Sequence, residues 1–243
     1  MELKMKIKDL RDVVNMLLTL VTEAKFEFTE KGLNVKCVDS AHVAMIVVNL
    51  GKEAFIEYDF EEEMSIGIDL DKIKDFLKLA APEDIVSLKL DDRKITFSVR
   101  NLTRSMTTID PSNITSPKIP SLGLPAKATV SSSQFAEGLR AGEAVSDNIT
   151  LYLTPNELEI YTSSEEDTSK MVIPKDLLKD LQCQEEVKSI YPIDYLLKFI
   201  RAVDFSENVT INLGKDYPVK IEFTFKDNKG DGLFLLAPRI EGD

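Results

Sequence analysis

Apolar residues return at helical spacing in four segments of this chain, and the segments follow one another at a nearly constant interval. Residues 9–21, 71–80, 133–141 and 194–203 each carry apolar side chains three or four positions apart, the pattern of a helix with one buried face. Leu10, Ile73, Phe135 and Tyr195 hold equivalent places, at spacings of 63, 62 and 60 residues. A period of this length predicts internal duplication.

Strands are predicted after each helix, because apolar and polar residues alternate there. The alternation is clearest in residues 83–90, 147–153 and 207–213, which follow the second, third and fourth helices. Further strands are expected at residues 32–38, 42–50, 94–100, 105–109, 157–162, 170–173, 219–225 and 233–236. The predicted fold class is therefore α+β, with two similar domains that each contain a duplicated helix-plus-strands repeat.

A proline-rich stretch, residues 111–127, separates two repeats from the other two. It contains four prolines and no strong periodicity, which is typical of a linker. We therefore expect a first domain at residues 1–110, a connecting loop at 111–127 and a second domain at 128–243. Ile119, Leu122 and Leu124 are apolar residues of this loop, and they either pack against the nearest sheet or form a docking surface.

The chain is acidic, with 42 Asp and Glu residues against 30 Lys and Arg and a formal net charge of −12. Nucleic acid repels such a chain on average, which argues against a protein that simply coats DNA. Cys37 and Cys183 do not form a metal-binding spacing and are expected to be reduced thiols. We expect a cytoplasmic protein, because no signal peptide opens the chain and no apolar run is long enough to span a membrane.

No group of residues in the sequence has the pattern of a catalytic site. His42 is the single histidine, and the apolar residues after it predict a structural position on a strand. The acidic runs at 61–63 and 165–167 stand beside predicted turns or strand ends, as solvated charge runs do. Phosphate-binding and nucleophile motifs do not occur. We therefore expect no cofactor and no enzyme, since an enzyme would require a polar catalytic cluster.

The polar faces of the predicted helices are less acidic than the chain, and basic residues outnumber acidic ones on the second and fourth. The basic residues of these faces are Arg11, Lys72, Lys74, Lys78, Arg140, Lys198 and Arg201. They are either ordinary solvated surface or, if all four helices lie on one side of the sheets, a surface that can face a phosphate backbone.

Three segments resemble one protein family. Residues 38–43, Val-Asp-Ser-Ala-His-Val, resemble the Asp-Ser-x-His-Val turn of DNA sliding clamps of the proliferating-cell-nuclear-antigen type, found in archaea and eukaryotes. Residues 122–125, Leu-Gly-Leu-Pro, are similar to part of their interdomain connecting loop. Residues 236–241, Leu-Ala-Pro-Arg-Ile-Glu, resemble their C-terminal tail. Order, spacing, length and the fourfold repeat match as well, so the resemblance covers essentially the whole chain.

The resemblance implies a ring of three two-domain subunits, with antiparallel sheets outside and helices lining a central hole. Such a ring encircles duplex DNA without sequence preference and acts as the processivity factor of a DNA polymerase. It also implies binding of the clamp loader, a flap nuclease and a ligase through short peptides that end in aromatic residues. A ring holds DNA topologically, so a few loosely placed basic side chains suffice.

The resemblance also assigns residues to sites. Arg11, Lys78, Arg140 and Arg201 match the DNA-facing positions, and helix geometry adds Lys72, Lys74 and Lys198. Leu18, Asp75 and Asp194 depart from the family, because relatives often carry a basic residue there. The partner-peptide pocket would be formed by Val38, His42, Met45, Leu122, Leu124, Pro125, Pro218, Leu235, Leu236, Ala237 and Pro238.

The subunit interface would pair two edge strands, residues 102–110 of one copy and 167–174 of the next. Its central residues would be Ser105, Met106, Thr107, Ser169, Lys170 and Met171. A second interpretation is a ring subunit with another duty, such as a damage checkpoint, or a member of a heterotrimer. A homotrimer in solution would favour the replication clamp.

Overall fold

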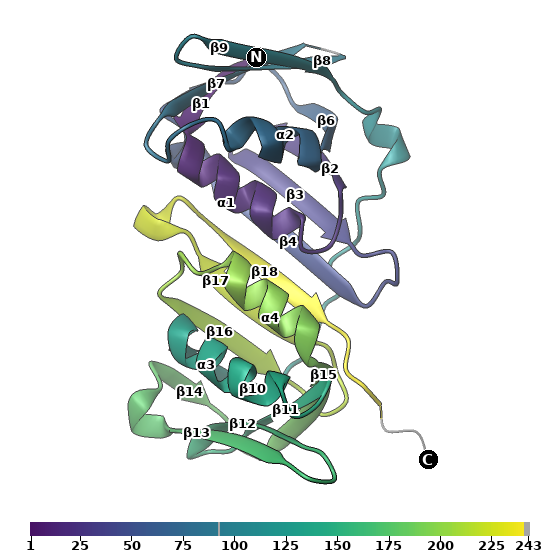
Figure 1. The fold of residues 1–243 in the computed structure, drawn as a ribbon, viewed down its shortest axis with the longest axis vertical. Helices are drawn as coiled ribbons and strands as arrows, with labels where there is room; N and C mark the ends of the chain where they lie inside the picture. Colours follow the sequence, from purple (N-terminus) through teal and green to yellow (C-terminus); the bar gives the residue numbers. More distant parts are fainter. Residues whose placement is uncertain (92, 241–243) are drawn as a thin grey trace. The chain divides into compact units, whose positions relative to one another are not determined.

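The computed structural model describes residues 1–91 and 93–240, and it divides into two compact units. The first unit contains residues 1–118 and 225–232, and the second contains residues 119–224 and the rest of the tail. Within each unit two helices lie side by side over the strands (Figure 1). The α+β class and the fourfold repeat are therefore confirmed.

The first unit holds two copies of one strand–helix–strand–strand–strand repeat. The first copy contains β1 (Glu2–Lys6), α1 (Ile7–Leu17), β2 (Glu23–Thr29), β3 (Gly32–Val38) and β4 (Ala44–Gly51). After the short strand β5 (Glu57–Asp59), the second copy contains β6 (Met64–Asp69), α2 (Leu70–Leu77), β7 (Ile85–Asp91), β8 (Lys94–Val99) and β9 (Leu102–Thr107).

The second unit repeats this order. Its first copy contains β10 (Ala126–Ser131), α3 (Ser132–Glu143), β11 (Asn148–Leu153), β12 (Glu157–Ser163) and β13 (Thr168–Pro174). After β14 (Asp180–Gln182), the second copy contains β15 (Val187–Pro192), α4 (Ile193–Ala202), β16 (Asn208–Leu213), β17 (Val219–Thr224) and β18 (Gly230–Leu236). Residues 230–232 of β18 are counted with the first unit. Single 3₁₀ turns occur at Lys52–Ala54, Pro111–Asn113, Lys175–Leu177 and Lys226–Asn228.

The first strand of each repeat pairs with a strand of the other repeat in the same unit. In the first unit β1 pairs with β7 and β6 pairs with β2, all antiparallel. In the second unit β10 pairs with β16 and β15 pairs with β11. One repeat therefore cannot complete its own sheet, which explains why two repeats make the smallest compact unit.

The strands before the helices are the main feature that sequence patterning missed. β1, β6, β10 and β15 each run directly into a helix, so the strand and helix patterns merge without a turn residue between them. The turn before β4 corrects a second prediction. His42 does not lie on a strand, because the buried Asp39 carboxylate accepts the N–H groups of Val43 and Ala44, each at 2.9 Å, and closes a turn. His42 is exposed there with a left-handed φ of 57°.

Glycines let α3 lie close to its sheet. A Cβ atom at Gly138 would stand 2.7 Å from Ile160 Cδ1 and 3.0 Å from Met171 Sδ. One at Gly142 would stand 2.9 Å from Ile149 Cδ1. Because protein interiors are packed without spare volume, larger residues would push the helix away from β12 and β13.

Both thiols are free, and burial raises the pKa of Cys37 to about 12. Within the described ranges no helix is long and apolar enough to cross a membrane.

Candidate nucleic-acid and partner interfaces

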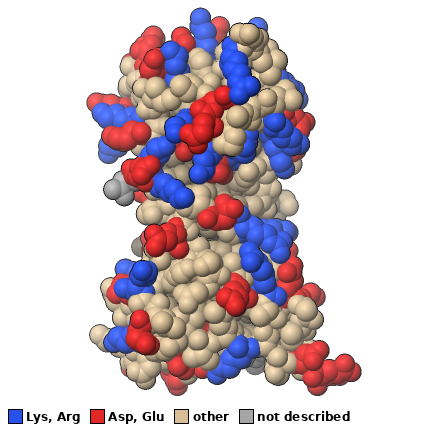
Figure 2. All heavy atoms as spheres, turned by 60° about the vertical axis from the view of Figure 1, so that its left-hand side comes forward, with Lys and Arg blue, Asp and Glu red and all other residues tan. Residues whose placement is uncertain are grey.

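The four helices are electrically neutral in an acidic chain. The helices carry equal numbers of acidic and basic residues. The seven acidic residues are Asp9, Asp12, Asp71, Asp75, Glu137, Glu143 and Asp194, and the seven basic residues are Lys8, Arg11, Lys72, Lys74, Arg140, Lys198 and Arg201. The net charge of −12 therefore belongs entirely to the strands, turns and loops. On the face drawn in Figure 2, basic and acidic side chains are interspersed and no large area carries one sign.

Four of the predicted DNA-facing residues form ion pairs, and in three of these pairs both side chains are exposed. Lys72 pairs with Asp69 at 2.9 Å, Lys78 with Asp75 at 2.9 Å, Lys198 with Asp194 at 3.1 Å and Arg201 with Glu143 at 3.4 Å. Lys78 is also the main reason why the pKa of Asp75 is lowered. Exposed pairs of this kind contribute little stability, so a phosphate can replace the carboxylate at small cost. Lys74 and Arg140 have no ion pair among the described residues.

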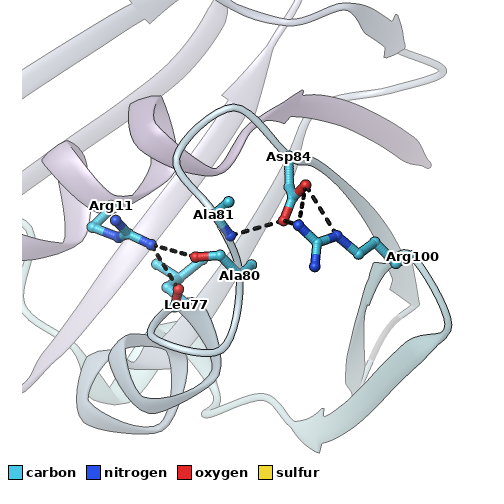
Figure 3. A network of polar contacts seen from close by, with 6 residues as sticks. All are labelled: Arg11, Leu77, Ala80, Ala81, Asp84 and Arg100. Atoms are coloured by element: carbon cyan, nitrogen blue, oxygen red, sulfur yellow. Dashed lines mark hydrogen bonds and ion pairs between the residues drawn. The ribbon is translucent and has the colours of Figure 1, made fainter.

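Arg11 differs from the other basic residues because its guanidinium binds the protein itself. It donates to the carbonyl oxygens of Leu77 and Ala80, at 2.8 and 3.0 Å, where α2 ends (Figure 3). The last carbonyls of a helix lack partners within the helix and carry partial negative charge, so a cation is favoured there. Next to this contact, Asp84 accepts the N–H of Ala81 and pairs with Arg100 at 2.7 Å. Arg11 therefore joins α1 to α2.

The turn between β3 and β4 presents three of the predicted pocket residues. Val38 and Met45 are cross-strand partners, and both are half-buried. His42 is exposed at the tip of the same turn. The sequence prediction thus grouped residues that are neighbours in the first unit.

The connecting loop contributes a second group, in the second unit. Leu124 packs on the bend between β16 and β17, since a Cβ at Gly214 would stand 3.0 Å from Leu124 Cδ2 and 3.6 Å from Pro125 Cδ. Leu122, Leu124 and Pro218 are half-buried and Pro125 is exposed. Ile119 is 44% exposed, so this apolar residue of the loop has not entered a core.

The tail behaves differently from its sequence prediction. Leu236 is fully buried and Leu235 is 5% exposed, so both side chains belong to the core and offer almost no surface to a partner. Ala237 and Pro238 remain half-buried. The next residue joins the sheet, because Arg239 N donates to Ile190 O on β15 at 2.7 Å.

Both predicted interface strands are edge strands. Among the described strands, β9 pairs only with β8, and β13 pairs only with β12. In β9, successive N–H groups point alternately toward β8 and away from it. The hydrogen bond from Thr108 N to Arg93 O shows which residues point which way: the N–H of Met106 points toward β8, and those of Thr103, Ser105 and Thr107 point away from it. In β13, the hydrogen bond from Lys175 N to Asn156 O gives the same information. The N–H of Met171 points toward β12, and those of Thr168, Lys170 and Val172 point away from it. Each edge therefore offers three residues with free backbone groups.

Sequence reasoning missed exposed apolar residues beside these groups. Tyr217 is 54% exposed on the bend that Leu124 covers, and Tyr191 Oη donates to its carbonyl oxygen at 2.8 Å. Leu79 and Leu102, 67% and 43% exposed, line a cavity of about 360 Å³ next to β9. Their only signal in the sequence is an apolar residue at the end of a helix or strand, which is common in any protein.

Two family models match the chain. The model of the proliferating cell nuclear antigen N-terminal domain matches residues 1–110, and that of the C-terminal domain matches residues 118–239. A DNA polymerase sliding clamp of Thermoplasma acidophilum is 39% identical over 242 residues, which cover 98% of each chain. A DNA polymerase sliding clamp of Methanosarcina barkeri is 34% identical over 237 residues, which cover 96% of each chain.

Solved structures give the same family. The chain is similar to the protein in a structure of the C-terminal region of FEN-1 bound to A. fulgidus PCNA, with a TM-score of 0.95 and 31% identity, over 100% of this chain and 99% of that one. It is also similar to PCNA from Thermococcus kodakaraensis, with a TM-score of 0.89 and 25% identity, over 98% and 99% of the chains.

Proposed function

Because this chain belongs to the proliferating cell nuclear antigen family of DNA polymerase sliding clamps, we propose that three copies close into a ring around duplex DNA and tether replication enzymes to it. Clamps of this family are processivity scaffolds and have no enzymatic activity. The observation that carries the proposal is the charge distribution, with neutral helices in a chain of net charge −12. If the helices line the hole, DNA meets the least repulsive surface of the protein.

The DNA-facing set follows from the contacts of the basic residues. Lys78, Arg140 and Arg201 are exposed, and their carboxylate partners, where present, are exposed too. Lys72, Lys74 and Lys198 belong to the same helices and supplement them. Arg11 contributes its charge to this surface while its hydrogen bonds serve the helix end. Contacts of this kind address phosphates and carry no sequence information, so the ring can slide.

Partner enzymes would bind through the pocket that the sequence predicted. The half-buried Val38 and Met45 and the exposed His42 support the floor, and Leu122, Leu124 and Pro125 support the flap. The half-buried Pro218 belongs to the far wall. The A. fulgidus relative has the C-terminal region of FEN-1 bound to it, which supports partner segments as ligands of this chain too. The polymerase, the clamp loader and a ligase are proposed to use the same pocket. The backbone from Leu235 to Pro238 would form the far wall.

Ring closure would pair β9 of one copy with β13 of the next. The outward residues Thr103, Ser105 and Thr107 can form three antiparallel pairs with Thr168, Lys170 and Val172, and two backbone bonds in each pair give up to six bonds per interface. Met106, Ser169 and Met171 would pack beneath this ladder. We also propose domain boundaries at residues 1–110, 111–127 and 128–243, and action at the chromosome in the cytoplasm.

A charge-reversal experiment tests the DNA surface. A variant with Lys78→Glu, Arg140→Glu and Arg201→Glu should still form rings and bind peptide, yet shorten the products of a primed-template extension assay at moderate salt. The reason is that negative charges would then line the hole and repel the DNA. The dependence of log affinity on log salt should also become less steep, by about 0.9 for each lost phosphate contact.

The matched control reverses three exposed lysines outside the four α-helices, Lys89, Lys175 and Lys179, with the same change of net charge. Product lengths should stay at the wild-type value in this control. Equal shortening by both variants would mean that total charge matters, and unchanged lengths in the helix variant would remove the DNA role of these residues.

A further inference from the structure

A surface cavity of about 510 Å³ lies in the second unit, where the described tail runs beside β15 (Figure 1). Residues of β11, β12 and β15 line it, and Arg239 and Ile240 of the tail close one side. Asn148, Thr150 and Ser163 contribute polar groups to its lining, and Lys188 contributes a cation.

The charge of this cavity is opposite to that of the chain. Among its described lining residues there is no carboxylate, although the chain carries 42 acidic residues. Lys188 and Arg239 have no ion pair with any described residue. Two cations without partners in one cavity of an acidic protein favour an anionic ligand.

The neutral groups of the cavity suit the same ligand. Thr150 is 7% exposed and lines the cavity, whereas the hydroxyl proton of Thr162 is already used within the sheet. Thr162 Oγ1 donates to the backbone oxygen of Asn148 at 2.7 Å, which fixes that side chain. Hydroxyl and amide donors beside two cations match the lone pairs of a carboxylate or a phosphate oxygen.

An adjoining cavity of about 660 Å³ shares Tyr161 and Lys188, and its other charged residues are two lysines and two glutamates, so it does not offset the positive charge. This neighbour has two carboxylates, and each already has a partner. Lys170 Nζ lies 2.7 Å from Glu159, and Tyr152 Oη donates to Glu186. Lys215 adds a third cation that has no ion pair in the described part of the chain.

Continuity with the tail identifies the occupant. Ala237 and Pro238 belong to the proposed partner surface, and the very next residue, Arg239, reaches the cavity. An extended partner peptide on this wall would therefore pass over the cavity with the residues that flank its docking motif. We propose that the cavity binds acidic side chains of this flank, so that the clamp prefers partners with Asp or Glu beside the aromatic-ended motif. This inference rests on the proposed function.

Three peptides test the preference. They share one aromatic-ended motif and carry four flanking residues that are all Glu, all Gln or all Lys, and their affinities are measured by fluorescence anisotropy. The Glu flank should bind about tenfold more tightly than the Gln flank, which corresponds to about 1.4 kcal/mol, and the Lys flank should bind more weakly than both.

Two double variants locate the effect. In Lys188→Gln with Arg239→Gln the Glu preference should disappear, while the affinity for the Gln-flanked peptide stays the same. In the control, Lys175→Gln with Lys179→Gln, the preference should persist, because these exposed lysines of the same unit do not line the cavity.

The outcomes separate this inference from the proposed function. If the Gln-flanked peptide does not bind at all, the peptide pocket is wrong. Equal affinities for the three flanks would overturn the inference and leave the pocket intact. A preference that appears only in a chain ending at Ile240 would mean that the protein's own acidic end occupies the cavity, which would also overturn it.

Discussion

Arg11 is the residue whose role changes most between sequence and structure, and replacing it with alanine tests the new role. The sequence places Arg11 among the DNA-facing residues, whereas its guanidinium donates to Leu77 O and Ala80 O at 2.8 and 3.0 Å (Figure 3). Removal of the side chain leaves both carbonyls without this donor at the end of α2. We expect that end to open more often, with the rest of the fold unchanged.

The size of the effect follows from the two bonds. A hydrogen bond that involves a charged group contributes about 1.5–3 kcal/mol when both groups are buried. Arg11 is only partly buried, so we expect about 2 kcal/mol for the pair of bonds together. This free energy corresponds to a change of about 30-fold in the equilibrium for local opening.

Hydrogen exchange measures this opening directly. The amides of Leu79 and Ala80 donate to Phe76 O and Leu77 O, so they report on the end of α2. Their exchange should be about 30-fold faster in Arg11→Ala, and amides of the second unit should keep their rates. Arg11→Lys should give an intermediate rate, since an ammonium lacks the planar fork that reaches two carbonyls.

Lys78→Ala is the matched control, because it removes a cation from the same helix end. Within the part of the chain that the structure describes, Lys78 pairs only with the exposed Asp75, a contact that contributes about 0.2–1 kcal/mol. If Arg11→Ala and Lys78→Ala have equal effects on exchange, the contacts of Arg11 do not hold α2. A normal exchange rate combined with poor loading on DNA would mean that Arg11 acts through its charge on the DNA surface and does not hold the end of α2.

Three further predictions concern the other surfaces. Leu124→Asp should abolish binding of an aromatic-ended peptide by placing a charge in an apolar contact, and unchanged affinity in a peptide titration would make the loop a spacer. Ser105→Pro or Lys170→Pro should convert the ring into folded monomers, as measured by light scattering, because each removes an N–H that points away from its own sheet. Intact trimers for both variants would refute the pairing of β9 with β13. A wild-type mass other than that of a homotrimer would favour a heterotrimer. Gly138→Ala should lower the melting temperature, because its Cβ would stand 2.7 Å from Ile160 Cδ1, whereas Gly123→Ala has nothing within 4 Å and should not.

The choice of proline sites shows what backbone geometry adds to a correct strand prediction. Met106 and Met171 lie at the centre of the two predicted interface strands, and strand position alone would select them as the sites for proline. Both residues turn their N–H toward their own sheet, so proline would damage the subunit itself. Alternation of side chains is visible in a sequence, but the direction of each N–H depends on the register with the neighbouring strand.

The sequence by itself determined the repeat, the fold class and the family. Helical spacing around Leu10, Ile73, Phe135 and Tyr195 is a local property, and a duplicated local pattern needs no tertiary information to be recognised. The loop and tail motifs lie in continuous stretches of chain, so they were readable too. The strands before the helices could not be predicted, because no turn residue separates the strand pattern from the helix pattern that follows it.

Only the tertiary structure decided which of the candidate residues are free to act. Arg11 and Arg140 look alike in the sequence, yet Arg11 binds two carbonyls on another helix and Arg140 binds no carboxylate in the described chain. Leu124 and Leu236 are both apolar, yet one covers a bend and the other is fully buried. Burial and hydrogen-bond partners come from residues far away in the chain, which brings Lys188 beside Arg239 and Arg11 beside Ala80, and no local pattern encodes them.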